Sequence, residues 1–169
     1  MIVRRERAGD ERELAALIDA AFGDTETSVF TRRIRESPGY VPELTFVADD
    51  GGELVGFTML SYVRAGTREV LILTPMAVRP DRQRGGVGKQ VVRAAVAAAD
   101  ARGAPVILVE GVPSYYPQFG FRSASALGFE RPDPRIPEAA WMALPLAAWD
   151  PALAAPVVYP GFFPPPPNA

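Results

Sequence analysis

A glycine-rich segment carries the clearest chemical pattern in the sequence. It reads Gln83-Arg84-Gly85-Gly86-Val87-Gly88-Lys89 and lies between a predicted strand and a predicted helix. The first amides of a helix have no acceptor within the helix, and the helix dipole adds partial positive charge there. Glycines let such amides approach a phosphate closely, because no Cβ intervenes. The segment predicts an anion site, with Arg82, Arg84 and Lys89 adding positive charge around it; a tight turn without a ligand is the alternative.

The spacing separates this segment from two other phosphate-binding loops. A Walker A loop requires Ser or Thr after its Gly-Lys pair, and here Gln90 follows Gly88-Lys89. A Rossmann loop follows the first strand and is trailed by an acid after the next parallel strand. This loop instead follows a predicted hairpin, which argues against a Rossmann domain, although Glu110 ends the next strand and keeps that alternative open.

Composition restricts the groups that could move protons. The 169 residues include no Cys and no His, which excludes disulfides, thiolate nucleophiles, Cys/His zinc sites and imidazole chemistry. Carboxylates, Tyr, Ser/Thr, Lys, backbone amides or a cofactor remain. With 18 basic and 20 acidic residues, the net charge of −2 argues against a nucleic-acid partner.

The chain ends and the apolar runs predict a soluble, cytoplasmic protein without a membrane partner. No apolar run follows the N-terminal charges, so no secretory signal is expected. The longest weakly polar stretch, Val91–Ala99, contains Arg93 and is too short to cross a bilayer. The prolines at 164–167 predict an extended, non-catalytic tail.

The elements before the glycine-rich segment can be placed from periodicity. Residues 2–5 predict a strand, and Asp10 with Glu13 predicts a capping box that opens a helix ending at Gly23. The apolar stripe of that helix is Leu14, Leu17, Ile18, Ala21 and Phe22. A second helix is expected from Thr27 or Ser28 to just before Pro38, with Phe30 and Ile34 packed.

Strands dominate the rest of the pattern. Residues 44–48 and 54–63 predict a hairpin across Asp50-Gly51-Gly52, and residues 70–78 predict a third strand, bulged or splayed near Pro75. A helix over 87–102, a strand over 106–109, a turn or short helix over 113–120 and a strand over 139–146 follow. We expect a mixed α/β fold, with one domain over residues 1–150 and a C-terminal extension over 151–169 ending in the proline-rich tail.

Two motifs resemble the GNAT superfamily of N-acetyltransferases. Residues 83–88 match the Gln/Arg-x-x-Gly-x-Gly/Ala signature of its motif A, and Met76–Asp81 resembles the strand end that precedes it. Tyr116-Pro117-Gln118-Phe119-Gly120-Phe121 is similar to the Tyr-x-x-x-Gly-Phe element of the family. The element order fits over about the first 130 residues. The segment Tyr159–Phe163 is similar to the corresponding C-terminal segment of the YhbS-like bacterial subgroup.

The resemblance implies a fold and a cofactor. The fold would be a central, mostly antiparallel sheet of about six to seven strands, with one splayed parallel pair and flanking helices. The cofactor would be acetyl-CoA or another short acyl-CoA, without a metal. Backbone groups of Met76 and Val78 would pair with the pantetheine arm, and the Val78 amide would polarise the thioester carbonyl. The full set of implied cofactor-binding residues is Met76, Ala77, Val78, Gln83, Arg84, Gly85, Gly86, Val87, Gly88 and Lys89.

The resemblance also implies catalytic roles. Tyr116 would protonate the leaving thiolate; a ring packed under the loop is the alternative. Some members carry a general base on the strand before motif A, but Leu71–Met76 contains no acid, so Glu110 becomes the candidate base, directly or through water. A solvated strand-end carboxylate is the alternative for Glu110, and Glu26 is a weaker candidate. The Asn that the family often places after the second parallel strand is missing from Val109–Ser114.

The implied function is direct transfer of an acetyl group from acetyl-CoA to a primary amine, on a small molecule or peptide, in a ternary complex. A non-catalytic acyl-CoA sensing module and a structural domain that binds incidental anions are the alternatives. Arg32, Arg33 and Arg35 predict a solvated helix face, with an acidic acceptor or the CoA 3′-phosphate as the alternative. Trp141 and Trp149 are expected to pack. A second copy of the chain is a further candidate partner, because residues 157–163 are apolar enough to cover a partner as readily as their own sheet.

Overall fold

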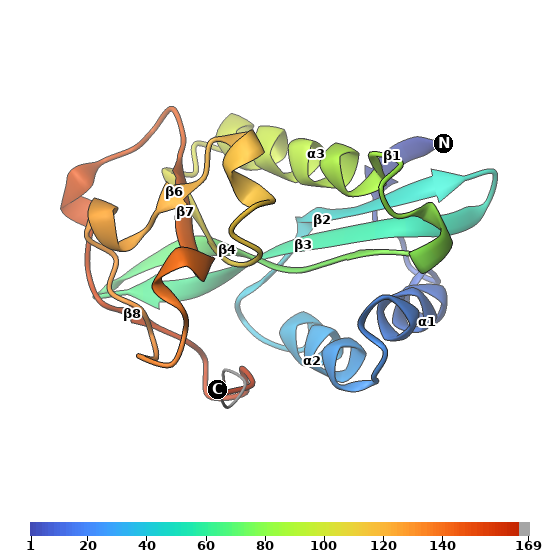
Figure 1. The fold of residues 1–169 in the computed structure, drawn as a ribbon, viewed down its shortest axis with the longest axis horizontal. Coiled ribbons are helices and arrows are strands. Elements are labelled where there is room, and N and C mark those ends of the chain that lie inside the picture. Colours follow the sequence, from blue (N-terminus) through green and yellow to red (C-terminus); the bar gives the residue numbers. More distant parts are fainter. Residues whose placement is uncertain (166–169) are drawn as a thin grey trace. The chain divides into compact units, whose positions relative to one another are not determined.

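A computed structural model describes residues 1–165 and shows three α-helices and eight strands in that range (Figure 1). The elements are β1 (Ile2–Arg5), α1 (Glu11–Phe22), α2 (Glu26–Arg35), β2 (Tyr40–Asp50), β3 (Glu53–Ala65), β4 (Arg68–Val78), α3 (Val87–Ala101), β5 (Val106–Glu110), β6 (Arg122–Ser123), β7 (Trp141–Pro145) and β8 (Val157–Val158). Short 3₁₀ turns lie among them, one of them over Tyr116–Phe119. Each helix and strand expected from the sequence forms, with ends shifted by a few residues.

The strands form one mixed sheet in the order β1-β2-β3-β4-β5-β7-β6, and β8 pairs with β3. The parallel pair is β4 with β5, in which Leu71 lies opposite Ile107 and Ile72 opposite Leu108. Strand β2 runs antiparallel to β1 and β3, and β7 runs antiparallel to β5 and β6. The predicted fold class is confirmed. The sheet exceeds the expected strand number because β6 and β8, at two residues each, are too short to leave a period in the sequence.

The chain forms two compact units. Met1–Ser61 with Thr74–Ala99 makes the first, and Tyr62–Leu73 with the residues from Asp100 onward makes the second. Strands β3 and β4 each contribute residues to both units.

In the first unit, α3 covers one face of strands β1 to β3, while α1 and α2 cover the other (Figure 1). The face under α3 is apolar, with Ala48 and Val55 packed against Val87 and Val91 of the helix. On the other face, the α1 side chains Leu14, Leu17 and Ile18 are buried, as their spacing predicts. Gly23 ends α1 in the left-handed conformation that the sequence indicated.

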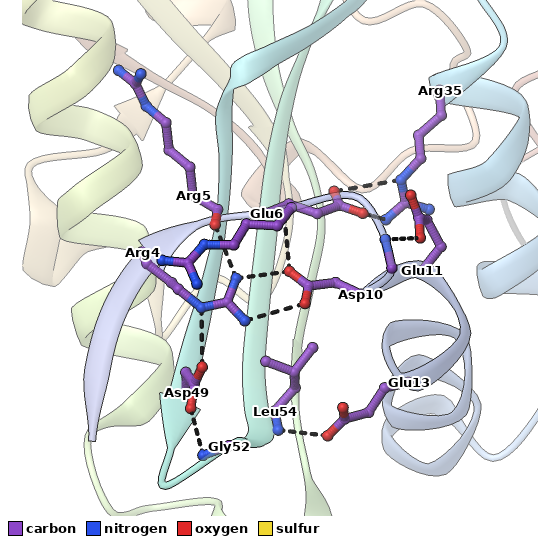
Figure 2. A network of polar contacts seen from close by, with 12 residues as sticks. Arg4, Arg5, Glu6, Asp10, Glu11, Glu13, Arg35, Asp49, Gly52 and Leu54 are labelled. Carbon is purple, nitrogen blue, oxygen red and sulfur yellow. Dashed lines mark hydrogen bonds and ion pairs between the residues drawn. The ribbon is translucent and has the colours of Figure 1, made fainter.

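Charged side chains tie β1 to the start of α1 (Figure 2). The Arg4 guanidinium donates to Asp10 at 2.7 and 3.1 Å and to Asp49 at 3.0 Å. The expected capping box is therefore wrong: Asp10 accepts from Arg4 and from the Arg7 amide, and Glu13 accepts from the Leu54 amide at 2.6 Å. A tertiary guanidinium and a strand amide displace the local bonds that the short-range pattern predicted.

Proline 75 does not interrupt β4. The strand runs unbroken from Arg68 to Val78, and the Thr74–Pro75 peptide bond is cis. The carbonyl of Pro75 accepts a hydrogen bond from the buried hydroxyl of Thr58 at 3.5 Å. Pairing of β4 with β5 is recorded at Leu71 and Ile72, upstream of the proline.

The second unit has its own core around β7. Trp141 is fully buried, and its indole N–H donates to the carbonyl of Phe129 at 2.9 Å. Trp149 and Tyr159 pack against the same core, so the packing roles expected for both tryptophans are confirmed. The C-terminal segment takes part through β8, where Val158 pairs with Arg64 of β3.

No helix within residues 1–165 is long and apolar enough to span a membrane. The tail predicted over residues 164–167 lies partly outside the described residues, which end at Pro165.

We predict that Asp10→Asn lowers the free energy of unfolding by about 2 kcal/mol at pH 7, because the charged partner of Arg4 is lost. Hydrogen bonds from Arg4 hold the pKa of Asp10 below its usual range. The folded pKa is depressed, so the stabilisation is complete above about pH 4, the ordinary Asp value, and disappears as the pH falls through the folded value. Urea unfolding at a series of pH values measures both effects.

The exposed residue Glu69 provides the control for this experiment. Glu69→Gln is expected to change the free energy of unfolding by less than about 0.5 kcal/mol both at pH 7 and at about pH 2. An Asp10→Asn penalty that persisted unchanged at pH 2 would contradict the ion-pair explanation.

Candidate functional site

The glycine-rich loop of the first unit is fixed at its entry from β4. The amide of Arg79 donates to the carbonyl of Val55 at 3.0 Å, which ties the end of β4 to β3. The amide of Arg82 then donates to the carbonyl of Arg79 at 2.9 Å, and the Gln83 side chain donates to the carbonyl of Val78 at 3.1 Å. These bonds hold the loop in one place before α3 begins.

The loop backbone leaves amides available for a ligand. Arg84 has a φ of 61° and Gly86 a φ of 85°, so both adopt the left-handed conformation. A Cβ placed on Gly86 would meet no atom within 4 Å, so the space beside this glycine is open. The amide of Gln90 makes an early α3 bond, to the carbonyl of Gly86 at 3.2 Å. Helix geometry therefore leaves the amides of residues 87–89 without acceptors in the helix.

The basic side chains near the loop differ in whether a carboxylate lies within ion-pair distance. Arg82 contacts Asp50 at 2.8 Å, and Asp50 also contacts the Met1 ammonium at 3.0 Å. Arg82 therefore shares one carboxylate with the Met1 ammonium and is ion-paired rather than free for a ligand. Within residues 1–165, Arg84 and Lys89 have no carboxylate within ion-pair distance, so they are the cations left for a ligand.

Gly56 sets the distance between β3 and the start of α3, and sequence reasoning missed it. A Cβ on this residue would lie 2.5 Å from Cγ1 of Val87 and 3.3 Å from Cβ of Ala48. Only a residue without a side chain allows the first turn of α3 to pack so closely on the strand. The available signal was a glycine inside a predicted strand.

In the second unit, Tyr116 is held by aromatic neighbours and by a glycine. Its side chain is buried, with the rings of Tyr115 and Phe121 in edge contact at 5.2 and 5.4 Å between centroids. A Cβ on Gly111 would lie 2.3 Å from Cε2 of Tyr116. The amide of Gly111 donates to the carbonyl of Ala140 at 3.0 Å, so the backbone under the ring is anchored. Phe121 is itself buried, whereas Phe119 is half-buried.

Burial raises the pKa of the Tyr116 phenol above its ordinary value, and the neighbouring Tyr115 raises it further. The hydroxyl therefore carries its proton throughout the neutral range. This state fits a proton donor and excludes a phenolate base at neutral pH.

Glu110 is the last residue of β5, and a partner from the C-terminal segment contacts its carboxylate. The hydroxyl of Tyr159 donates to Oε2 of Glu110 at 3.2 Å. Although Glu110 is an exposed residue, partial desolvation of its carboxylate raises its pKa; the Tyr159 hydrogen bond opposes this, and the charge of Asp133 adds to it. The carboxylate is thus a better proton acceptor than a fully solvated one.

The remaining candidates lie elsewhere in the first unit. Glu26 opens α2, where its amide donates to the Asp24 side chain. Arg32 and Arg33 are exposed, as a solvated face requires, but Arg35 turns inward to contact Glu6 at 2.8 Å. Within residues 1–165, no three acidic side chains gather as they would around a metal ion.

Comparison with known proteins places the chain in a family. A family model described as an acetyltransferase (GNAT) domain matches residues 42–123. An uncharacterised N-acetyltransferase of Escherichia coli K12, YjhQ, is 31% identical over 155 residues, which cover 87% of this chain and 83% of YjhQ. The chain therefore belongs to the GNAT family and is an acyltransferase, as its motifs predicted.

Solved structures agree with this fold. The GNAT family N-acetyltransferase YhbS of Escherichia coli, in complex with CoA, has a TM-score of 0.86 at 24% identity and covers 95% of this chain and 90% of YhbS. A GNAT family acetyltransferase of Brucella melitensis, in complex with acetyl-CoA, has a TM-score of 0.79 at 24% identity and covers 96% and 97% of the two chains. Both likenesses show the GNAT fold.

We predict that Gly111→Ala destabilises the protein by about 1–3 kcal/mol, because the added methyl group overlaps the Tyr116 ring. In a Tyr116→Ala background the same substitution should cost less than about 0.5 kcal/mol, because the ring is gone. Chemical denaturation of the parent protein, the two single variants and the double variant measures this coupling.

Gly161→Ala is the matched control, because a Cβ at Gly161 meets nothing within 4 Å. It should leave stability within about 0.5 kcal/mol of the parent protein. Equal costs for Gly111→Ala with and without the Tyr116 ring would refute the contact.

Proposed function

We propose that this protein is an acetyl-CoA-dependent N-acetyltransferase that transfers the acetyl group directly to a primary amine in a ternary complex. The observation that carries the proposal is the loop before α3. Within residues 1–165, Arg84 and Lys89 there form no ion pair, the amides of residues 87–89 have no acceptor in the helix, and the space beside Gly86 is open. Membership of the GNAT family supports it, as do the similar structures solved with CoA and acetyl-CoA. The acceptor is proposed to be a small molecule or a peptide.

The loop fits a pyrophosphate chemically. Residues 84–89 would supply backbone amides, with Gln83 fixing the turn and Arg84 and Lys89 balancing the negative charge. Met76, Ala77 and Val78, at the end of β4, would bind the pantetheine arm through their backbone. Acetyl-CoA, when bound, supplies an activated acetyl thioester.

Two side chains of the second unit are proposed to handle protons. Glu110, directly or through a water, would take one proton from the acceptor ammonium, which frees the amine to attack the thioester carbonyl. Tyr116 would donate its phenolic proton to the sulfur as the C–S bond breaks. The phenol would then recover, through solvent, the proton that the amine loses when the amide bond forms. Direct transfer suits a chain without cysteine, since no thiol is available for a covalent acyl-enzyme.

We expect Gly86→Glu to weaken CoA binding by about 100-fold or more, because it places bulk and negative charge beside the proposed pyrophosphate position. Isothermal titration calorimetry with CoA measures the effect. Gly103→Glu is the matched control, since Gly103 also has a positive φ (74°) and open space around it but lies beyond the other end of α3. Undiminished binding by the Gly86 variant would refute the anion site.

Tyr116→Phe is expected to lower kcat about tenfold or more while leaving the Kd for acetyl-CoA within about twofold of the parent value, because only the proton donor is removed. Transfer rates on a panel of amines measure this effect. Tyr115→Phe, at the neighbouring and half-buried tyrosine, is the control and should retain activity. An unchanged kcat would remove Tyr116 from the mechanism, and tight acetyl-CoA binding without turnover by the parent protein would favour a sensing module.

A further inference from the structure

The C-terminal segment brings a tyrosine to the carboxylate of Glu110. Strand β8 pairs Val157 and Val158 with Ala65 and Arg64 of β3, and the amide of Val157 also donates to the carbonyl of Glu130 at 3.1 Å. These bonds fix the backbone immediately before Tyr159. The phenol then reaches a residue 49 positions earlier in the chain.

Packing restricts the Tyr159 ring as well as its backbone. The ring contacts Trp141 edge-on, with 6.3 Å between centroids, and Phe163 at 4.8 Å. Trp141 lies opposite Glu110 in the pairing of β5 with β7 and is itself fully buried. Trp141 is therefore both the cross-strand neighbour of Glu110 and a support for the Tyr159 ring.

We propose that Tyr159 is a positioning residue that holds the Glu110 carboxylate through its hydroxyl, which makes residues 157–163 part of the acyl-transfer apparatus. The proposal rests on the role of Glu110 proposed above. It places a functional residue outside the two GNAT motifs. Phenylalanine at position 159 could make the same ring contacts with Trp141 and Phe163 but could not donate a hydrogen bond to the carboxylate.

The electrostatics around Glu110 give the proposal a direction that can be measured. Two neighbours act in opposite senses: the Tyr159 hydrogen bond stabilises the charged carboxylate, and the anionic Asp133 disfavours it. Asp133 stays ionised because Arg135, at 2.7 Å, holds its pKa at about 2. Burial raises the pKa of Tyr159, so its hydroxyl remains a donor over the pH range in which Glu110 titrates.

The test is a titration of the Glu110 carboxyl carbon by NMR in the full-length protein, with Glu110→Gln used to assign the signal. Tyr159→Phe should raise the titration midpoint by about half to one pH unit, because the charged form loses a hydrogen bond. Asp133→Asn should lower it, because a nearby negative charge is removed. Tyr62→Phe, at a partly buried tyrosine of β3, is the control and should not move it. A Tyr159→Phe midpoint within about 0.2 pH units of the parent value would overturn the proposal.

A second measurement needs no change at Tyr159 and covers the case in which that variant does not fold. In the parent protein, the Cζ signal of Tyr159 should shift at the pH where Glu110 titrates, and the shift should vanish in Glu110→Gln. A Tyr159 signal that does not follow Glu110 would overturn the proposal equally.

The pH dependence of kcat/KM separates this inference from the proposed function. If Glu110 is the base, the midpoint of the acid limb of the profile moves to higher pH in Tyr159→Phe and to lower pH in Asp133→Asn. The size of each shift should equal the shift that the NMR titration gives. A profile that is identical in the parent and Glu110→Gln would remove Glu110 from catalysis. The NMR result on Tyr159 would still decide whether the carboxylate is held as proposed.

Discussion

The end of α3 that is proposed to bind an anion depends on the absence of a side chain at Gly56. Gly56 lets the first turn of the helix lie against β3 at a distance that a single methyl group would close, and the loop before the helix is then fixed by bonds from Arg79, Arg82 and Gln83. The amides of residues 87–89, which have no acceptor in the helix, belong to this first turn, so Gly56 sets where they lie. A larger residue at Gly56 would displace the amides of residues 87–89, which are proposed to bind the anion.

The second unit uses the same device at Gly111. Here the glycine lies under the Tyr116 ring, and its amide donates to the carbonyl of Ala140, the residue before β7, so the ring rests on anchored backbone rather than on a movable side chain. A phenol held in this way has few alternative rotamers, which is the condition for donating a proton along one direction. Glu110 immediately precedes this glycine, so the proposed base and the residue that supports the proposed acid are consecutive in the chain.

Much of the fold could be predicted from local patterns. The stripe of α1, the hairpin turn at residues 50–52 and the glycine-rich start of α3 are short-range signals, and the helices and strands they indicate are present. What failed was non-local. The capping box at Asp10 gave way to a guanidinium from β1, Arg82 forms an ion pair with Asp50, and Arg35 turned towards Glu6. The hydrogen bond from Tyr159 to Glu110 joins residues 49 apart, and no spacing rule reaches that far.

The backbone conformation of Arg84 carries a cost in stability. A side chain in the left-handed conformation costs about 1 kcal/mol or more, and the loop places an arginine there although glycines follow it at positions 85 and 86. Glycine at position 84 would relieve that strain, so the chain carries a residue that is locally worse for folding. A library of variants selected for thermal stability alone would therefore be expected to lose the arginine at this position, and a library selected for turnover would be expected to keep it.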